Sequence, residues 1–362
     1  MINIKAQLHY SNEEIKKKNA NFNLVYGEKS GGKSYQMKHN EMVCHFLETG
    51  KRFILLRRWK EDITNLWLDR YFNEDVDIKK LTKGKYNYIT SYRKELYLSN
   101  IQENGKIVRG VKIGYAMSLS TEQHMSSASF LDVDSIVFEE FMERGAYIAH
   151  EADKLMIFYN TIDRGRGVVK LWLVGNTITR VNPYLRDWGL QEVVRKQKQG
   201  DIDVIEIHNE NNTVRLAIEY AKSVNNKQMS IGNASNMIDK GAWQTNPQPH
   251  LPKSRKLYEK NFECGFLYKG FKFSAEFLQD KNKNTCWFIY PQTKDFKKDI
   301  LIFSDVVKIN PLWQTDIYNI TKLRTDKIRK FFIDTFRECN IFYSDDLTGT
   351  DFKQAINFSI RR

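Results

Sequence analysis

The sequence of 362 residues has few of the features that mark membrane or secreted proteins. Its apolar runs are short, as at 53–56 and 171–174, whereas a membrane-spanning helix needs about 20 apolar residues. The opening residues, MINIKAQLHY, carry no apolar signal segment. The sequence therefore predicts neither a membrane partner nor secretion.

Cysteine is also scarce. The four cysteines, Cys44, Cys264, Cys286 and Cys339, are far apart and form no Cys-x-x-Cys pair. This spacing argues against a zinc knuckle or a disulfide framework and predicts free thiols in a reducing cytosol. The seven histidines form no His-Glu-x-x-His pattern, so a metalloprotease has no support.

Basic residues, by contrast, are in excess. Lysine and arginine exceed aspartate and glutamate by 57 − 44 = 13, and hydrophobic residues make up 41% of the chain. The hydrophobic content predicts a folded protein rather than a disordered one. The charge favours a polyanionic partner such as nucleic acid.

Proline is rare, and its position suggests a domain boundary. Three of the six prolines fall within 247–252, where they disfavour helix and central strand. The preceding stretch is polar, with loop-like clusters at 209–212 and 225–227. We therefore expect a domain over 1–200, a small linker domain over 201–248 and a C-terminal domain over 249–362. From residue 251 onward the net charge is 21 − 14 = +7.

Strand-like and helix-like segments alternate in the first part of the chain. Apolar strands are predicted at 22–26, 53–59, 135–138 and 170–174, helices at 34–49 and 151–162, and an antiparallel set at 86–90, 95–98 and 106–113. This alternation predicts an α/β fold, a mainly parallel sheet with helices on both faces. The last part differs, with antiparallel strands at 266–278 and 285–290 and a closing helix at 322–337.

One segment matches the phosphate-binding loop G-x4-G-K-[ST] at every fixed position, after a predicted strand and before a predicted helix. Its glycines let backbone N–H groups approach a phosphate chain. Lys33 is expected to reach the β- and γ-phosphates, and Ser34 to bind Mg²⁺. We therefore expect ATP and Mg²⁺ as cofactors, with the nucleotide held by Gly27, Glu28, Lys29, Ser30, Gly31, Gly32, Lys33 and Ser34.

A pair of acids follows the predicted strand at 135–138. Successive strand residues point in different directions, so the two acids are expected to do different work. Glu139 is expected in the Mg²⁺ shell, and Glu140 is expected to orient and polarise the attacking water. The alternative is a solvated acidic strand end.

Three further polar features are weaker candidates. Asn176 ends an apolar strand and could sense the γ-phosphate, or be an ordinary turn residue. Arg164 and Arg166 lie in a glycine-rich turn, where either could be an arginine finger for a neighbouring subunit or part of a solvated loop.

The segment Arg57-Arg58-Trp59-Lys60 combines cations with an aromatic residue at the end of a predicted strand. Such a composition suits a nucleic-acid backbone. Arg57, Arg58 and Lys60 are therefore candidate DNA contacts, although a surface strand end is the plainer reading.

Taken together, the blocks NFNLVYGEKSGGKSYQMK, FILLRRWKEDI, SIVFEEF, NTIDRGRG and VGNTITRVNPYL resemble the DNA-packaging ATPases (encapsidation proteins) of small phi29-like tailed phages. The resemblance covers about residues 20–190. It implies a P-loop ATPase domain, a linker domain and a C-terminal α+β domain of RNase H-like fold.

The same resemblance implies roles for particular residues. Residues 27–34 would be the Walker A motif, Glu139 the Walker B acid and Glu140 the catalytic glutamate. Arg164 would act in trans, Asn176 would be the sensor, and Lys60 would face DNA in a pore.

A nuclease centre needs converging carboxylates. The C-terminal strands carry only Glu276, and Asp345-Asp346 is the only acidic pair, in a predicted loop. We therefore expect a vestigial nuclease domain that binds nucleic acid without cleaving it.

The resulting functional hypothesis is an ATPase that moves double-stranded DNA into a viral prohead. The resemblance implies a ring, usually pentameric, at the prohead portal in the host cytoplasm, with a packaging RNA as a further possible partner. The alternatives are a helicase-like ATPase and a nucleotide-switched nucleic-acid-binding assembly protein.

Overall fold

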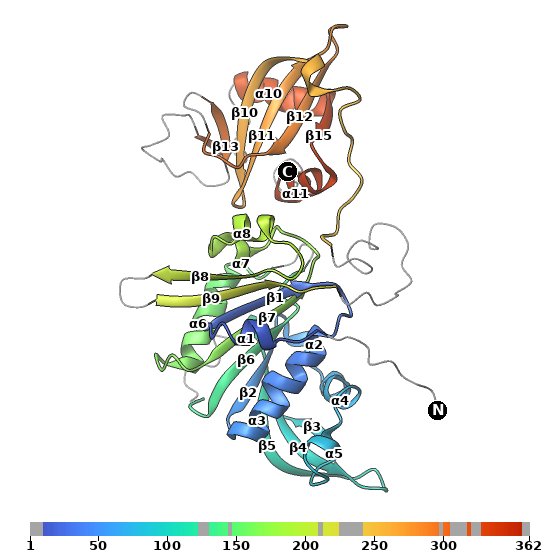
Figure 1. Cartoon of the computed structure of the whole chain (residues 1–362), viewed down its shortest axis with the longest axis vertical. Coiled ribbons are helices and arrows are strands. Elements are labelled where there is room, and N and C mark those ends of the chain that lie inside the picture. The colour runs from blue at the N-terminus through green and yellow to red at the C-terminus, as the bar shows by residue number, and fades with distance from the viewer. Residues whose placement is uncertain are drawn as a thin grey trace. The chain divides into compact units, whose positions relative to one another are not determined.

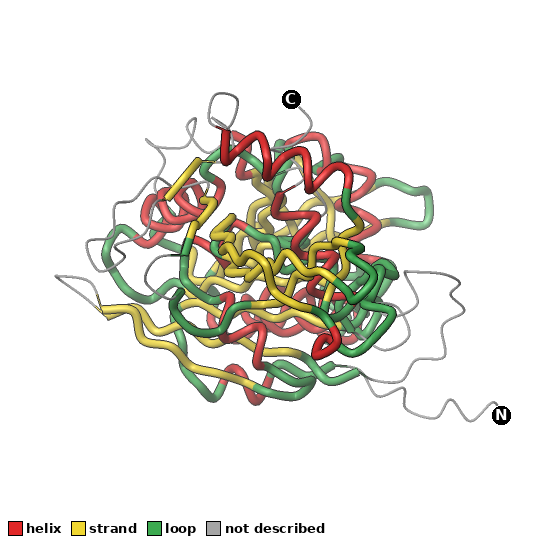
Figure 2. Tube along the Cα trace, turned by 90° about the horizontal axis from the view of Figure 1, so that it is seen from above, coloured by secondary structure: helices red, strands yellow, loops and turns green. Residues whose placement is uncertain are grey.

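The computed structural model describes residues 10–121, 130–143, 147–208, 213–223, 242–296, 300–304, 317–319 and 327–356. The chain divides into two compact units. The first unit comprises Met1–Ile178 and Val193–Ala242, and the second comprises Thr179–Glu192 and Trp243–Arg362. Figure 1 labels the elements of both units, and Figure 2 distinguishes helices, strands and loops along the trace.

The first unit is built on a single sheet, which has nine strands within the described residues. Their order across the sheet is β3-β4-β5-β2-β6-β7-β1-β9-β8. In chain order the bounds are β1 Phe22–Gly27, β2 Arg52–Arg57, β3 Tyr88–Tyr92, β4 Glu95–Ile101, β5 Ile107–Ser118, β6 Val133–Glu139, β7 Lys170–Asn176, β8 Ile202–His208 and β9 Thr213–Tyr220.

The middle of this sheet is parallel. Strands β5, β2, β6, β7, β1 and β9 run parallel to one another, while β3, β4 and β5 at one edge and β8 and β9 at the other are joined by antiparallel pairing. Every residue of β1 is buried, as expected for a parallel strand covered on both faces. The predicted α/β fold with a mainly parallel sheet is confirmed, as are the strands expected at 22–26, 53–59, 135–138 and 170–174.

Helices cover both faces of this sheet (Figure 1). On one face, Ser135 of β6 donates a hydrogen bond to the carbonyl of Glu41. On the other, Tyr159 packs edge-to-face on Phe22 of β1, with ring centroids 4.8 Å apart. The helical segments are α1 Glu13–Lys16, α2 Lys33–Gln36, the π-helix η1 Met37–Cys44, α3 His45–Thr49, the 3₁₀ turn η2 Lys60–Asp62, α4 Asn65–Asn73, α5 Ile78–Leu81 and α6 Glu151–Asp163. The helix predicted over 34–49 is therefore one run of α2, η1 and α3 with π geometry in its middle.

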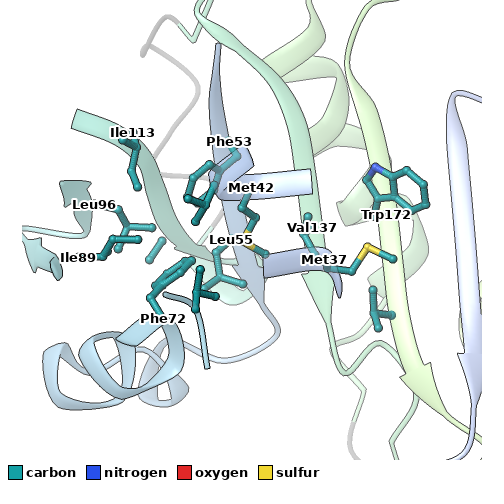
Figure 3. Packing of buried hydrophobic residues seen from close by; sticks show 14 of the residues in the cluster. Met37, Met42, Phe53, Leu55, Phe72, Ile89, Leu96, Ile113, Val137 and Trp172 are labelled. Carbon is teal, nitrogen blue, oxygen red and sulfur yellow. The ribbon is translucent and has the colours of Figure 1, made fainter. Parts of the chain in front are cut away.

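The core on the η1 face joins the central strands to the antiparallel edge. Figure 3 shows side chains of η1, the central strands β2, β6 and β7, helix α4 and the edge strands: Met37, Met42, Phe53, Leu55, Phe72, Ile89, Leu96, Ile113, Val137 and Trp172. Because α4 shares this core with β3, β4 and β5, the insertion between β2 and β6 is fixed firmly to the parallel sheet.

The structure differs from the predicted linker over 201–248. Strand β9 pairs with β1 in parallel, and its residues Leu216, Ala217 and Ile218 are buried. Strand β8 then pairs with β9. These strands thus extend the main sheet, because the apolar run of β9 is buried beside β1. The loop-like clusters at 209–212 and 225–227 lie outside the described residues.

The second unit contains a mixed sheet in the order β14-β13-β10-β11-β12-β15. Three antiparallel strands, β10 to β12, are extended by parallel partners. This sheet fits the C-terminal α+β domain that the resemblance implies. The bounds are α7 Pro183–Asp187, η5 Arg255–Leu257, β10 Glu259–Tyr268, β11 Phe271–Gln279, β12 Thr285–Pro291, β13 Leu301–Ser304, β14 Ile317–Asn319, α10 Lys327–Glu338, β15 Asn340–Tyr343 and α11 Asp346–Ile356, while α8 Gln191–Lys196 spans the sequence boundary between the units.

Details of this unit refine the predictions. The segment 266–278 contains two strands, because Lys269 and Gly270 both take positive φ and form a tight hairpin turn. The closing helix is found as α10, although residues 322–326 lie outside the described residues. All four cysteines are free, as predicted.

Candidate functional site

The phosphate-binding loop connects the end of β1 to the start of α2. Gly32 has φ of 89°, a left-handed conformation that favours glycine. Gly27 lies so close to Ala221 that a Cβ built on it would be 3.2 Å from the Ala221 Cβ. Lys29 and Ser30 are exposed, whereas Glu28 is 2% exposed and accepts a hydrogen bond from Ser223.

Lys33 is the buried cation of the loop. Its Nζ donates to the carbonyl of Glu28 and, at 3.3 Å, to Oδ1 of Asn176. Burial lowers the pKa of Lys33 to about 8, although the charges of Glu139 and Glu28 act in the opposite direction. The register of β1 and β7 places Gly27 opposite Asn176, so the two strand ends bring the lysine and the amide together.

Glu139 ends β6 and is 3% exposed. One carboxylate oxygen accepts a hydrogen bond from Ser34 Oγ at 2.8 Å, and the other accepts one from the Tyr71 hydroxyl at 2.9 Å. Burial raises the pKa of Glu139, while Ser34, Tyr71 and the charge of Arg57 act to lower it.

The pair of Ser34 and Glu139 suits a hard divalent cation. Such a cation prefers oxygen ligands, including hydroxyl, carboxylate and substrate phosphate oxygens. Among the described residues, no group of three or more His, Cys, Asp or Glu side chains could hold a metal. Ser34 and Glu139 could hold such an ion together with the phosphate oxygens of a nucleotide.

Glu140 has a different environment from Glu139. Its φ is 59°, an uncommon left-handed conformation for a non-glycine residue, and its side chain is 63% exposed. Nη2 of Arg57 donates to its carboxylate at 2.7 Å. The Arg57 guanidinium in turn lies 5.1 Å from the ring centroid of Trp67. The two adjacent acids are thus held by separate partners, as their positions on the strand predicted.

The three candidate DNA contacts separate in the structure. Arg58 is 3% exposed and donates to both carboxylate oxygens of Glu151 at 2.9 Å. It also donates to Glu143 and to two carbonyls. Arg58 is therefore a buried structural residue, and its assignment as a DNA contact is corrected. Arg57 lies beside Glu140, and Lys60 alone is well exposed.

The two arginines of the glycine-rich turn also separate. Arg166 donates hydrogen bonds to the carbonyls of Asp163, Leu131, Val133 and Ile162 at 2.8–3.0 Å. Arg164 ends α6 with φ of 51° and is exposed. Arg166 therefore anchors the turn to the start of β6, and Arg164 is presented at the surface.

The acidic candidates of the second unit are each held by separate partners: Glu276 and Asp346 by basic side chains, and Asp345 by its own helix turn. Nε of Arg255 lies 2.6 Å from Oε2 of Glu276. Asp345 accepts a hydrogen bond from the backbone N–H of Thr348 at 2.7 Å, and Asp346, which begins α11, lies 3.1 Å from His250.

Sequence reasoning missed the contribution of α4. Trp67 and Tyr71 lie four residues apart on this helix, with ring centroids 4.8 Å apart. Thr64 caps the helix by accepting from the N–H of Trp67. The cap and the aromatic spacing could have predicted a helix, but not that its side chains reach Glu139 and Arg57.

No helix in the described parts of the chain is long and apolar enough to cross a membrane.

Comparison with known proteins gives a family. A family model described as "Podovirus DNA encapsidation protein (Gp16)" matches residues 4–237. The chain is also 29% identical over 197 residues to the DNA packaging proteins of Bacillus phages PZA and phi29, which covers 52% of this chain and 53% of each relative.

The chain thus spans about half the length of the curated relatives it matches. A solved structure, "The bacteriophage Phi-29 viral genome packaging motor assembly", matches 98% of this chain and 100% of that chain with a TM-score of 0.58 at 18% identity, which supports the fold. Because the family model covers well over half of the residues, the chain belongs to the podovirus DNA encapsidation protein (Gp16) family.

Proposed function

We propose that this protein is an ATPase that drives double-stranded DNA into a viral prohead. The observation that carries the proposal is the convergence of Lys33, Ser34, Glu139 and Asn176 at the carboxyl ends of the central parallel strands. These residues come from three strand ends, and ligands of parallel α/β sheets bind beyond the carboxyl ends of the strands.

ATP would bind with its phosphates against the loop 27–34. Lys33 would balance the β- and γ-phosphate charge, and Ser34 with Glu139 would hold Mg²⁺. The ion, when bound, would offset charge that develops on the transferred phosphoryl group. The hydrogen bond between Lys33 and Asn176 supports a sensor role, because a phosphate that attracts the lysine would alter that contact.

Glu140 would orient the water and accept its proton. It is the exposed acid of the pair, and Nη2 of Arg57 lies 2.7 Å from its carboxylate. Breaking this ion pair would free the carboxylate for the water. We therefore assign Arg57 to the ATP-hydrolysis site, beside Glu140, rather than to DNA binding.

Arg164 would act on the nucleotide of a neighbouring subunit. Its turn is anchored near Val133, at the start of β6, whereas Glu139 ends the same strand. A strand of this length spans about 20 Å at 3.3 Å per residue. Arg164 is therefore out of reach of its own site, so a finger role needs a ring in which one subunit faces the next.

The proposed partners follow from charge and from the family. Lys60, exposed after β2, would contact the DNA backbone. The basic second unit would bind nucleic acid, either DNA or a packaging RNA, without cleaving it. A ring of subunits, of five by the resemblance, would assemble on the prohead portal in the host cytoplasm.

ATP hydrolysis by the purified protein, with DNA and portal-bearing proheads, tests the proposal. Wild type should hydrolyse ATP faster with both present and protect DNA from nuclease, while Glu140→Gln should bind ATP without turnover. Turnover with strand separation would favour a helicase-like ATPase. ATP binding that never leads to hydrolysis would favour a nucleotide-switched assembly protein.

A mixing experiment tests the finger. Arg164→Ala and Glu140→Gln should each be inactive alone. In a random equal mixture, about a quarter of the interfaces pair an intact Glu140 with an intact Arg164, so partial activity should return. No recovery would exclude Arg164 as the residue acting between subunits.

A further inference from the structure

The segment that contains α5 and the antiparallel strands β3 to β5 is unusually basic. Residues 78–115 contain nine cations and two anions, Glu95 and Glu103, which gives 9 − 2 = +7 of the chain's net +13. The cations are Lys79, Lys80, Lys83, Lys85, Arg93, Lys94, Lys106, Arg109 and Lys112. A concentration of charge this large attracts a polyanion.

The two faces of β3, β4 and β5 differ in chemistry. One face carries apolar residues such as Leu96, Leu98 and Ile113, which pack in the core with Phe72 of α4 (Figure 3). Neighbouring residues along a strand point to opposite faces. Tyr97, between two of these leucines, and Lys112, next to Ile113, therefore lie on the other face.

Three more residues join Tyr97 and Lys112 on that side through their contacts, namely Tyr92, Arg109 and Tyr115, because register shifts between β4 and β5 interrupt the strict alternation. We call the set Tyr92, Tyr97, Tyr115, Arg109 and Lys112 the tyrosine face. The guanidinium of Arg109 lies 4.0 Å from the ring centroid of Tyr92 and 5.8 Å from that of Tyr97. Lys112 lies 5.1 Å from the ring of Tyr115 and pairs with Glu95 at 2.9 Å. Tyr92 is 42% exposed.

A hollow adjoins the tyrosine face. It has a volume of about 310 Å³, and its lining includes Arg93, Lys94, Tyr115 and Phe130 together with Glu95, whose charge Lys112 offsets. The rings of Tyr115 and Phe130 meet edge-to-face at 5.3 Å. This volume falls at the lower end of the range for small-ligand sites, and the lining offers both aromatic surface and cations.

Rings and cations together point to one kind of polyanion. A duplex keeps its bases inside and presents phosphates, for which cations alone suffice. Unpaired bases instead stack on aromatic rings and on arginine planes. We propose that the tyrosine face and its hollow bind unpaired nucleotides of a single-stranded nucleic acid.

In this arrangement a base extends the stack of Tyr92 and Arg109. Phosphates on either side contact Arg93 and Lys112. A second base enters the hollow beside Tyr115. The surface uses none of the residues assigned to ATP, so the inference stands independently of the proposed ATPase.

The proposal is tested by comparing the affinity of the full chain for single strands and for a duplex, without ATP. Fluorescence anisotropy measures the binding of labelled 20-nucleotide oligo(dT) and oligo(U) and of a labelled 20-base-pair duplex. Tyr92→Leu and Tyr97→Leu should each weaken single-strand binding about tenfold and leave duplex binding unchanged. Arg109→Gln should weaken single-strand binding and make it less salt-dependent. The ratio of the oligo(U) and oligo(dT) affinities distinguishes RNA from DNA as the preferred source.

Arg70→Gln is the matched control, since Arg70 is an exposed arginine of α4 with 68% of its side chain accessible. It should leave single-strand affinity unchanged. Photocrosslinking of 5-iodouracil strands to the wild type should label tyrosines within 92–115, which keeps the test decisive if a variant fails to fold. Equal affinity for single strand and duplex, or crosslinks confined to other segments, would overturn the proposal.

Discussion

The hydroxyl of Tyr71 donates a 2.9 Å hydrogen bond to one carboxylate oxygen of Glu139, while Ser34 donates a 2.8 Å bond to the other. A helix of the insertion thereby helps to position the acid that we assign to the metal shell. Glu139 is almost fully buried, so each donor stabilises its ionised form and keeps the carboxylate in a defined orientation.

Removal of the tyrosine hydroxyl should therefore weaken metal use. In Tyr71→Phe the pKa of Glu139 should rise further, because burial is then opposed by one donor fewer. We expect the Mg²⁺ concentration for half-maximal ATPase activity to increase several-fold and the acid limb of the pH profile to move to higher pH.

Tyr159→Phe is the control for that variant. The Tyr159 hydroxyl donates to the carbonyl of Val169 at 3.0 Å, next to the start of β7, whereas Glu139 lies opposite Val174 near the end of that strand. It should lower the melting temperature slightly and leave the Mg²⁺ dependence unchanged. The same Mg²⁺ and pH curves for Tyr71→Phe and wild type would contradict the positioning role.

The pKa of Lys33 predicts a pH dependence for ATP binding. Burial lowers that pKa to about 8 in the nucleotide-free protein, and the phosphates of ATP would raise it again. Above pH 8 the protein must then take up a proton when ATP binds, so affinity should fall by up to about tenfold per pH unit. Equilibrium binding of a fluorescent ATP analogue from pH 7 to 9.5 measures this, and a flat profile would contradict it.

The carboxyl of Glu219 predicts a pH dependence of stability. Burial raises its pKa to about 7, against the 2.6 Å hydrogen bond from Tyr10. At a pH between the unfolded and folded pKa values, Glu219 is protonated in the folded protein and ionised in the unfolded chain. The free energy of unfolding should therefore fall as pH rises from about 4.5 to 7. Glu219→Gln should remove this loss and raise stability at pH 8 by on the order of 2 kcal/mol.

Melting temperatures of wild type and Glu219→Gln at pH 5 and pH 8 check this expectation. The difference between the two proteins should be small at pH 5 and large at pH 8. A difference of the same size at both values would show that the substitution acts through packing alone.

Substitutions at Arg58 and at Lys60 should have different effects although the two residues lie two positions apart: the first should lower stability, and the second should weaken DNA binding. Arg58→Met leaves Glu151, which is fully buried, without its ion-pair partner, and should cost about 3–5 kcal/mol of folding free energy. Lys60→Gln should leave stability within about 0.5 kcal/mol and weaken duplex DNA binding. Urea unfolding and DNA binding measure the two effects, and a stable Arg58→Met that loses only DNA affinity would reverse the assignment.

The amino-acid sequence alone was enough to predict the phosphate-binding loop and the class of the fold. A glycine-rich loop between a buried strand and a helix has few structural outcomes, because its glycines, lysine and hydroxyl must lie beside the helix N-terminus. The apolar runs at 22–26, 135–138 and 170–174 likewise predicted strands of a mainly parallel sheet, since strands buried on both faces need continuous apolar side chains.

The surroundings of the neighbouring polar residues became clear from the three-dimensional structure. Local sequence cannot distinguish Arg57, Arg58 and Lys60, yet strand alternation and partners distant in the chain direct them to Glu140, to Glu151 and to solvent. The contact of Tyr71 with Glu139 joins residues that are 68 positions apart in the sequence. Strand β9 pairs with β1 although strands β2 to β8 lie between them in the sequence. Such contacts depend on packing among elements far apart in sequence, and no local pattern encodes them.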